Sequence, residues 1–168
     1  MWVTAIFSGD LACDVRDQYY ALLSMGKSDQ QAYKLIVDSY KNEDLDEDEP
    51  VFWYALALSQ WKKGRLMENV KQEALKHLDS GVDLLRWDTP GNEKNFRKRK
   101  AELDKLRKQL LSPMPPRKKI AKRTLIRSPW QVGDLLAYKL MNENTKDLGY
   151  FGQYVLLRVI FLSKQFLK

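Results

Sequence analysis

Three carboxylates near the start of the chain have the spacing of a metal-binding helix face. Asp10, Asp14 and Asp17 stand at i, i+4 and i+7, so one side of a helix carries all three. Carboxylate oxygens suit a divalent cation. Arg16 and nearby polar groups can equally neutralise them, and exposed carboxylates are common. We therefore expect no metal here, although an enzyme's site would be sought first at this cluster.

The residue types of nucleophilic catalysis are scarce. Cys13 and His77 each occur once, and no motif or spacing links them, so we expect an ordinary, partly buried thiol. A single cysteine excludes an internal disulfide framework and a zinc site of several cysteines. A single histidine excludes catalytic sites built on two. The sequence predicts a non-enzymatic protein without a cofactor.

A run of carboxylates precedes Pro50. It holds Glu43, Asp44, Asp46, Glu47, Asp48 and Glu49. The run lacks the glycine and the spacing of a calcium-binding loop. We expect a solvated loop whose charges suit the positive end of the helix that follows.

A strongly basic stretch covers residues 94–123, with thirteen cations against two carboxylates. Twelve of these cations are our predicted partner-binding residues: Lys94, Arg97, Lys98, Arg99, Lys100, Arg107, Lys108, Arg117, Lys118, Lys119, Lys122 and Arg123. Phosphate neutralisation by such a stretch would bind nucleic acid with steep salt dependence. An acidic protein partner, including the N-terminal half of another copy, fits the same charges. A solvated helix face followed by a soluble linker needs no partner at all.

The charge is polarised along the chain. Residues 1–50 carry net −7, residues 51–100 net +5 and residues 101–168 net +9, for a total of +7. Such a dipole orients a charged partner at long range, mainly at low salt.

Helical periodicity dominates the first two thirds of the chain. It predicts helices over about 10–25, 28–40, 51–63, 67–80 and 93–111, with a short turn at 82–87. Ser28 and Gln31 form a capping-box pattern. The third helix is apolar almost all round, which places it in the middle of a bundle. Five tryptophans are expected in the core, and Trp2 or Trp87 becomes an interface candidate if it is exposed.

A proline-rich, basic segment separates the helices from two predicted strands. Residues 112–129 are expected to form a linker, because Pro113, Pro115 and Pro116 favour extended chain. Alternating apolar residues over 130–140 predict a strand with one buried face, and an apolar run over 154–162 predicts a strand covered on both faces. We expect the two strands to be antiparallel and joined by a loop. We therefore predict an α+β fold: a bundle of four or five helices over 1–111, the linker, and a small β element of two or three strands over 130–168.

Two strands alone are marginal in water. The hairpin must lie on the helices, gain a strand from residues 123–126, or pair with another chain through an open edge, as in a homodimer.

No apolar run reaches the roughly 20 residues of a membrane helix, and residues 1–10 have no basic stretch typical of a secretory signal. We expect a cytoplasmic protein that does not engage a membrane.

The opening Met1-Trp2-Val3-Thr4-Ala5-Ile6-Phe7-Ser8-Gly9-Asp10 resembles an uncharacterised bacterial protein family, as do residues 51–57 and 110–113. Members have Gly where this chain has Val3, and they continue past the segment corresponding to residues 154–160 into more strands. The resemblance therefore implies that the small β element is a shortened version of a larger sheet. Residues 130–138 and 152–159 also resemble the start of the small β domain of immunity proteins from bacterial toxin systems. Together with the absence of catalytic motifs, the polarised charge and the open strand edge, the second resemblance leads us to expect a bacterial or phage protein that neutralises a toxin or defence nuclease by surface occlusion. A nucleic-acid-binding module using residues 94–123 is the alternative.

Overall fold

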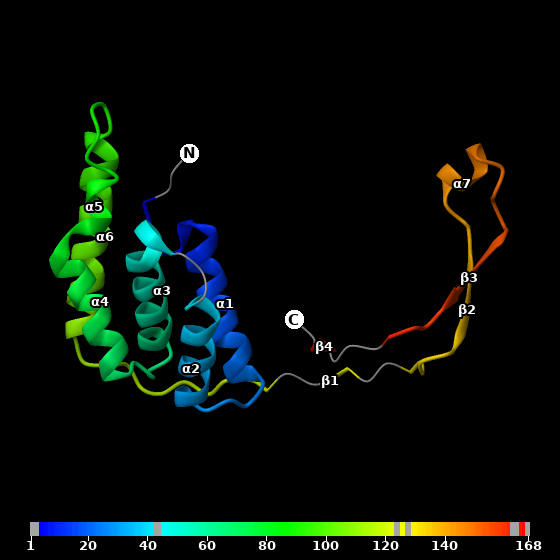
Figure 1. Ribbon diagram of the computed structural model, residues 1–168, viewed down its shortest axis with the longest axis horizontal. Helices are drawn as coiled ribbons and strands as arrows, with labels where there is room; N and C mark the ends of the chain where they lie inside the picture. Colours follow the sequence, from blue (N-terminus) through cyan, green and yellow to red (C-terminus); the bar gives the residue numbers. More distant parts are fainter. Residues whose placement is uncertain (1–3, 42–44, 123–124, 127–128, 162–164, 167–168) are drawn as a thin grey trace. The chain divides into compact units, whose positions relative to one another are not determined.

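The computed structural model describes residues 4–41, 45–122, 125–126, 129–161 and 165–166. The chain divides into a helical unit, residues 1–122, and a C-terminal unit, residues 123–168 (Figure 1). The fold is α+β, as predicted: helices dominate, and the strands pair antiparallel in the C-terminal unit.

The described part of the helical unit holds six α-helices and two 3-10 turns. These are η1 (Ile6–Ser8), α1 (Asp10–Ser24), α2 (Asp29–Tyr40), η2 (Asp46–Asp48), α3 (Glu49–Lys62), α4 (Glu68–Ser80), α5 (Val82–Leu85) and α6 (Glu93–Leu111). Ser28 and Gln31 form the expected capping box at the start of α2. Helix α1 begins after Gly9, which has no side chain to cap the helix.

Helix α3 is the centre of the bundle, as its apolar sequence predicts. It packs against α1, α4 and α6, and Figure 1 shows it between α1 and α4. Phe52, Tyr54, Leu56 and Leu58 are all buried. Buried Leu103, Leu106 and Leu110 of α6 belong to the same core.

Burial also perturbs titrating groups in this core. Desolvation, reinforced by the nearby Asp83 carboxylate, raises the pKa of the Tyr54 hydroxyl far above its ordinary value, and desolvation does the same for Tyr19. It lowers the pKa of the partly buried Lys62 ammonium, where Arg16 and Lys105 act in the same direction. Neutral side chains are therefore favoured inside the bundle.

The segment predicted as a linker is partly docked on the bundle. Residues 112–122, which we call the strap, run along the helical unit: Lys118 N–H donates to the Lys63 carbonyl at 3.0 Å, and Ile120 packs against the core. Arg65 Nη1 and Arg117 Nη2 donate to Asp29 at 2.6 and 2.7 Å. The compact unit accordingly ends at Lys122 rather than at residue 111.

Gly64 makes room for the strap. Its φ is +65°, and a Cβ on it would lie 2.4 Å from the Pro115 carbonyl oxygen. The strap's prolines have no N–H, so close approach leaves no donor unpaired at those positions.

The C-terminal unit contains two separate two-stranded antiparallel sheets. Strand β2 (Leu135–Lys139) pairs with β3 (Tyr154–Arg158), and the short helix α7 (Glu143–Asp147) lies in the loop between them. Strand β1 (Leu125–Ile126) pairs with β4 (Gln165–Phe166), so the candidate third strand does not extend the β2–β3 hairpin. The predicted alternation over 130–140 is a strand only from Leu135 onward.

Candidate functional site

The β2–β3 hairpin carries the most distinctive surface of the chain. Its register opposes Leu136 to Leu157, Ala137 to Leu156 and Tyr138 to Val155. Because side chains alternate across a strand, the hairpin has two faces. The apolar face comprises Leu136, Tyr138, Val155 and Leu157; the mixed face comprises Leu135, Ala137, Lys139, Tyr154, Leu156 and Arg158.

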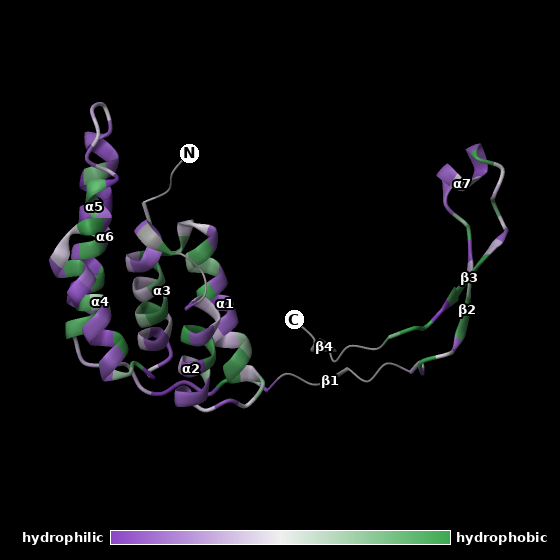
Figure 2. Cartoon of the chain, viewed as in Figure 1, coloured by the Kyte–Doolittle hydropathy of each residue, from purple (hydrophilic) through white to green (hydrophobic). Residues whose placement is uncertain are grey.

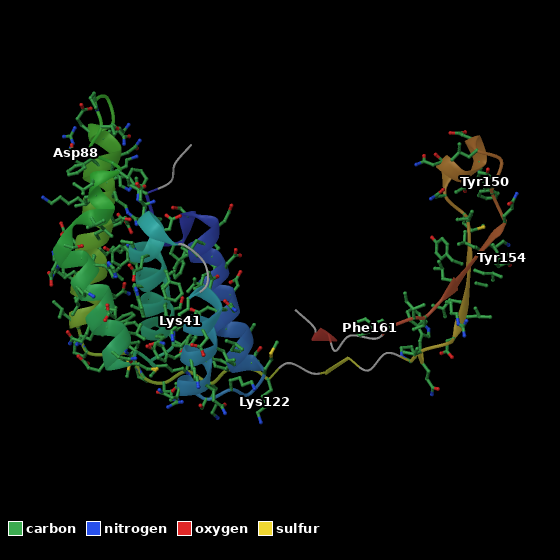
Figure 3. All side chains as sticks on the ribbon, viewed as in Figure 1. Lys41, Asp88, Lys122, Tyr150, Tyr154 and Phe161 are labelled. Carbon is green, nitrogen blue, oxygen red and sulfur yellow. The ribbon has the colours of Figure 1, made fainter. Side chains whose placement is uncertain are left out.

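Apolar side chains on this hairpin are exposed, and the described part of the C-terminal unit does not itself supply the buried face expected for β2 or the cover expected on both faces of β3. Of the twenty large apolar residues exposed among the described ones, fourteen lie in residues 130–161. Leu156 is 71% exposed, Leu157 51% and Tyr138 60%. Figure 2 shows hydrophobic residues along both strands, and Figure 3 shows Tyr154 among the side chains of β3.

The exposed apolar area of these residues is large, although it is not one continuous patch. At about 100 Å² for each half-exposed large side chain, the fourteen residues present on the order of 1,400 Å². They are spread over both faces of the hairpin, its loop end and the chain on either side of it. No described side chain of residues 129–161 is buried. The hairpin therefore has no core of its own within the described chain.

Local geometry nevertheless defines the hairpin. Gly149 and Gly152 take positive φ values of 73° and 80° next to the loop, and the Asn142 side chain accepts from Thr145 N–H to start α7. On the mixed face, the Lys139 ammonium lies 5.7 Å from the centre of the Tyr154 ring, a cation–π contact. The hairpin is thus a formed but uncovered ribbon.

A second surface follows the outward side of α6. Leu103, Leu106 and Leu110 face the core, and the opposite side presents five cations in successive turns: Lys94, Arg97, Lys98, Lys105 and Lys108. We call these five the basic stripe. It spans about 21 Å at 1.5 Å per residue. Among the described residues, Lys105 of the stripe forms a loose ion pair with Glu102, at 3.9 Å.

Helix α6 begins beside an anionic group. The exposed Glu93 carboxylate accepts from Gly91 N–H at 3.1 Å. Backbone N–H groups, its own first and then that of Gly91, lower the pKa of this carboxyl. The pairing satisfies part of the helix N-terminus.

Arg99 is not part of any exposed surface, which corrects its assignment to partner binding. It is 4% exposed, and its Nε and Nη2 donate to the two Asp83 carboxylate oxygens at 2.7 and 2.8 Å. Its Nη1 also donates to the Thr4 carbonyl at 3.1 Å. Arg99 therefore joins α6, α5 and the N-terminal segment, a structural role that the sequence interpretation missed. The available signal was its position on the same helical stripe as Leu103 and Leu106.

The other predicted partner-binding residues divide by environment. Arg107 pairs with Asp79, and Arg117 with Asp29. Exposed cations outside the basic stripe are Lys100, Lys118, Lys119 and Lys122. Arg123 lies outside the described residues. The structure therefore divides the basic stretch into the basic stripe of α6, the exposed lysines of the strap, and arginines that form ion pairs within the helical unit.

No metal centre is found among the carboxylates of the described residues. Within those ranges no group of three or more His, Cys, Asp or Glu side chains could hold an ion, and Asp17 instead accepts from Arg16 at 2.8 Å. The Cys13 thiol donates to the Phe7 carbonyl at 3.4 Å, whereas His77 lies 3.9 Å from Glu49. In the acidic run, Asp48 pairs with Arg86 at 2.8 Å, while Glu43 and Asp44 fall outside the description.

A cavity of about 480 Å³ lies between η1, the start of α1, η2 and α5. Asp83, Arg86 and Arg99 line it, but their charges already pair with one another and with Asp48. Trp87 is buried at its edge, and Trp53 and Trp61 pack on the core; Trp130 is 49% exposed, and Trp2 lies outside the described residues. Of the described tryptophans, Trp130 is the exposed one.

The chain matches no family model, no curated protein and no solved structure with which it was compared. The resemblances noted in the sequence remain predictions. Among the described residues, no helix combines the length and apolar character needed to cross a bilayer.

Proposed function

We propose that this chain is a non-enzymatic protein-binding module, and that its β2–β3 hairpin is the contact surface for a protein partner. The partner supplies the apolar cover that the hairpin lacks. A toxin or a defence nuclease, neutralised by surface occlusion, is the narrower form of the proposal and rests on the sequence resemblance.

The concentration of exposed apolar residues in one small unit supports this proposal. The helical unit buries Phe52, Leu56 and Leu106 in an ordinary core, so the chain does have the means to cover apolar side chains. In the hairpin, Leu136, Tyr138, Val155 and Leu157 make a face without one charged side chain. Large exposed apolar surfaces of this kind mark interaction sites.

The hairpin's chemistry also suits a protein better than a nucleic acid or a small metabolite. Its faces offer aromatic and aliphatic anchors, the side chains that dominate protein interfaces. Cations stand at the ends of the mixed face, at Lys139 and Arg158, which is typical of a polar rim around an apolar centre.

The test compares two pairs of substitutions in the full chain. Tyr138→Ser with Leu157→Ser removes the centre of the apolar face; Leu35→Ser with Leu85→Ser removes two exposed apolar residues of the helical unit and is the control. A host protein retained by the wild type is purified and titrated against all three chains.

We expect the hairpin variant to bind that purified partner at least tenfold more weakly, with the control within twofold of the wild type. Equal affinity of all three chains would place the contact elsewhere and contradict the proposal.

A second candidate, nucleic-acid binding, is favoured by the basic stripe of α6. Five cations on one exposed helix face would release counterions from a phosphate backbone, giving a slope of log K against log salt of roughly −4 for a duplex. Gel shifts at two salt concentrations measure this slope.

The variant Lys98→Glu with Lys105→Glu should then reduce duplex affinity and flatten the slope. Lys27→Glu with Lys34→Glu makes the same change in net charge on exposed residues around α2, so it separates the stripe from overall charge. Equal losses of duplex affinity in both variants would mean that the duplex is attracted by the overall charge of the chain and not by the basic stripe.

A further inference from the structure

We propose that the chain forms a two-fold dimer in which β3 pairs antiparallel with β3 of a second copy, centred on Leu156. The pairing turns two hairpins into one four-stranded sheet. The inference rests on the proposed function only in one respect: the enlarged apolar face of that sheet is the surface offered to the protein partner.

The hydrogen-bond pattern of the hairpin leaves the required backbone groups free to point outward. Val159 N–H donates to the Asp134 carbonyl at 2.9 Å, and Leu140 N–H donates to the Gln153 carbonyl at 2.9 Å. Bonded and non-bonded pairs alternate in an antiparallel ladder, so Val155 and Leu157 direct their backbone groups toward β2. The N–H and C=O groups of Tyr154, Leu156 and Arg158 therefore point away from β2.

The outer edge of β3 has no neighbour among the described residues, since the hairpin is a two-stranded sheet there. An antiparallel copy centred on Leu156 opposes Leu156 to itself and Tyr154 to Arg158 of the second copy. All three outward residues then meet outward residues, and the five-residue strand overlaps along its whole length. A register shifted by one residue would oppose outward groups to inward ones and lose the bonds.

The side chains of this register are complementary in charge and polarity. Arg158 of each copy faces the Tyr154 ring of the other, which repeats between copies the contact that Lys139 makes with Tyr154 within one hairpin. Val155 faces Leu157 of the other copy on the apolar face. No like charges are opposed within the paired strands.

The β2 edge is less suitable. The same pairing about Ala137 opposes Lys139 to Leu135, so each cation meets an aliphatic side chain instead of a ring. The β3 edge is therefore the favoured one.

Dimer formation would also stabilise the hairpin, because a sheet of only two strands is marginally stable in water. A lone hairpin without a covered face is marginal in water, whereas three or more strands can support one another. Two copies of Leu136, Tyr138, Val155 and Leu157 make a continuous face of eight apolar side chains, which the partner of the proposed function would then cover.

Proline substitution separates the two edges. Leu156→Pro removes an outward N–H that β2 does not use, so it blocks β3 pairing with little loss to the hairpin itself. Ala137→Pro does the same to the outer edge of β2 and is the matched control.

Sedimentation equilibrium of the full chain over a range of concentrations should show a dimer for the wild type and for Ala137→Pro. We expect the dissociation constant of the dimer to be at least tenfold higher for Leu156→Pro than for the wild type. A wild type that stays monomeric at every concentration, or equal weakening by both prolines, overturns the inference.

Cross-linking tests the register independently. Residue 156 faces its own copy at a Cα separation of about 5.5 Å, within disulfide range. In a Cys13→Ser background, Leu156→Cys should form a covalent dimer on mild oxidation and Ala137→Cys should not. Cross-linking through residue 137 alone would assign the dimer to β2 and contradict the proposal.

These readouts need no partner protein, so the two proposals fail separately. A monomer that still retains its partner through the hairpin overturns the dimer alone. A dimer that retains no protein overturns the proposed function alone.

Discussion

The two units of this chain use similar apolar residues in opposite ways. In the helical unit Leu56, Leu106 and Tyr54 are buried and touch many neighbours, whereas Leu156, Leu157 and Tyr154 of the C-terminal unit are largely exposed. A helix such as α3 can bury every side by packing between other helices, but a two-stranded ribbon has no third layer. The difference teaches that the first unit is stabilised by its own core, whereas the described residues of the second unit form no core.

The largest effect should come from the ion pair inside the helical unit. Asp83→Ala leaves the buried Arg99 guanidinium without its carboxylate, and we expect a loss of about 3–5 kcal/mol in the free energy of unfolding. Chemical denaturation of the full chain measures it. Asp79→Ala breaks the partly exposed pair with Arg107 and should cost less than about 1 kcal/mol. Losses of equal size would mean that the Asp83–Arg99 pair is no more important than a surface pair.

The next effect tests whether the strap belongs to the stable unit. Gly64→Ala and Gly81→Ala both place a side chain at positive φ, 65° and 67°, and each should lose about 1 kcal/mol for that reason. The Cβ at residue 64 also meets the Pro115 carbonyl, which should add about 1–3 kcal/mol. The Cβ at residue 81 meets nothing within 4 Å. If denaturation shows the same loss in both variants, the strap contributes nothing to stability.

A third effect appears at alkaline pH and again concerns only the helical unit. Burial raises the pKa of Tyr19 and Tyr54 in the folded chain, while the unfolded chain ionises near the ordinary value of 10.0. The folded state is therefore fully favoured below pH 10 and loses stability as the pH rises above it, by about 1 kcal/mol per tyrosine over the first pH unit.

The slope of unfolding free energy against pH above 10 measures this loss. Tyr54→Phe should reduce the slope, because one of the two buried hydroxyls is then absent. An unchanged slope would mean that other groups cause the alkaline loss.

The smallest effect on stability is expected in the hairpin. Tyr138→Ser with Leu157→Ser should change the unfolding of the helical unit by less than about 0.5 kcal/mol, while binding of an apolar dye to the full chain falls. Leu56→Ala in α3 should instead cost about 2–5 kcal/mol. A large loss from the hairpin pair would show that the two units share a core.

The helices were predictable because their signals are local. The capping box at Ser28, the proline in the first turn of α3 and the glycine after α4 each act through neighbouring residues. The structure confirms the predicted capping box and places Pro50 at the start of α3 and Gly81 at the end of α4. The docked position of the strap was not predictable. Its prolines exclude a helix, but they pack against Gly64, which lies about fifty positions earlier in the sequence. The helical stripe that Arg99 shares with Leu103 and Leu106 indicates its inward orientation, but nothing local indicates that Asp83 of another helix pairs with it.

The candidate surface was predictable in part. Two apolar strands and an unsatisfied edge follow from alternation over residues 130–162. The sequence interpretation expected at least one face of each to be covered, because apolar strands usually are. The pairing of β1 with β4 instead of the hairpin is a long-range choice that no local pattern shows.

The docked strap determines where a fragment containing only the helical unit should end. A fragment ending at residue 111 would keep every helix of the first unit, yet it would lose Ile120 and the arginine that shares Asp29 with Arg65. Apolar core residues that Ile120 covers would then be exposed to solvent, and the fragment would tend to aggregate. A fragment intended to yield this part in isolation should therefore extend through Lys122.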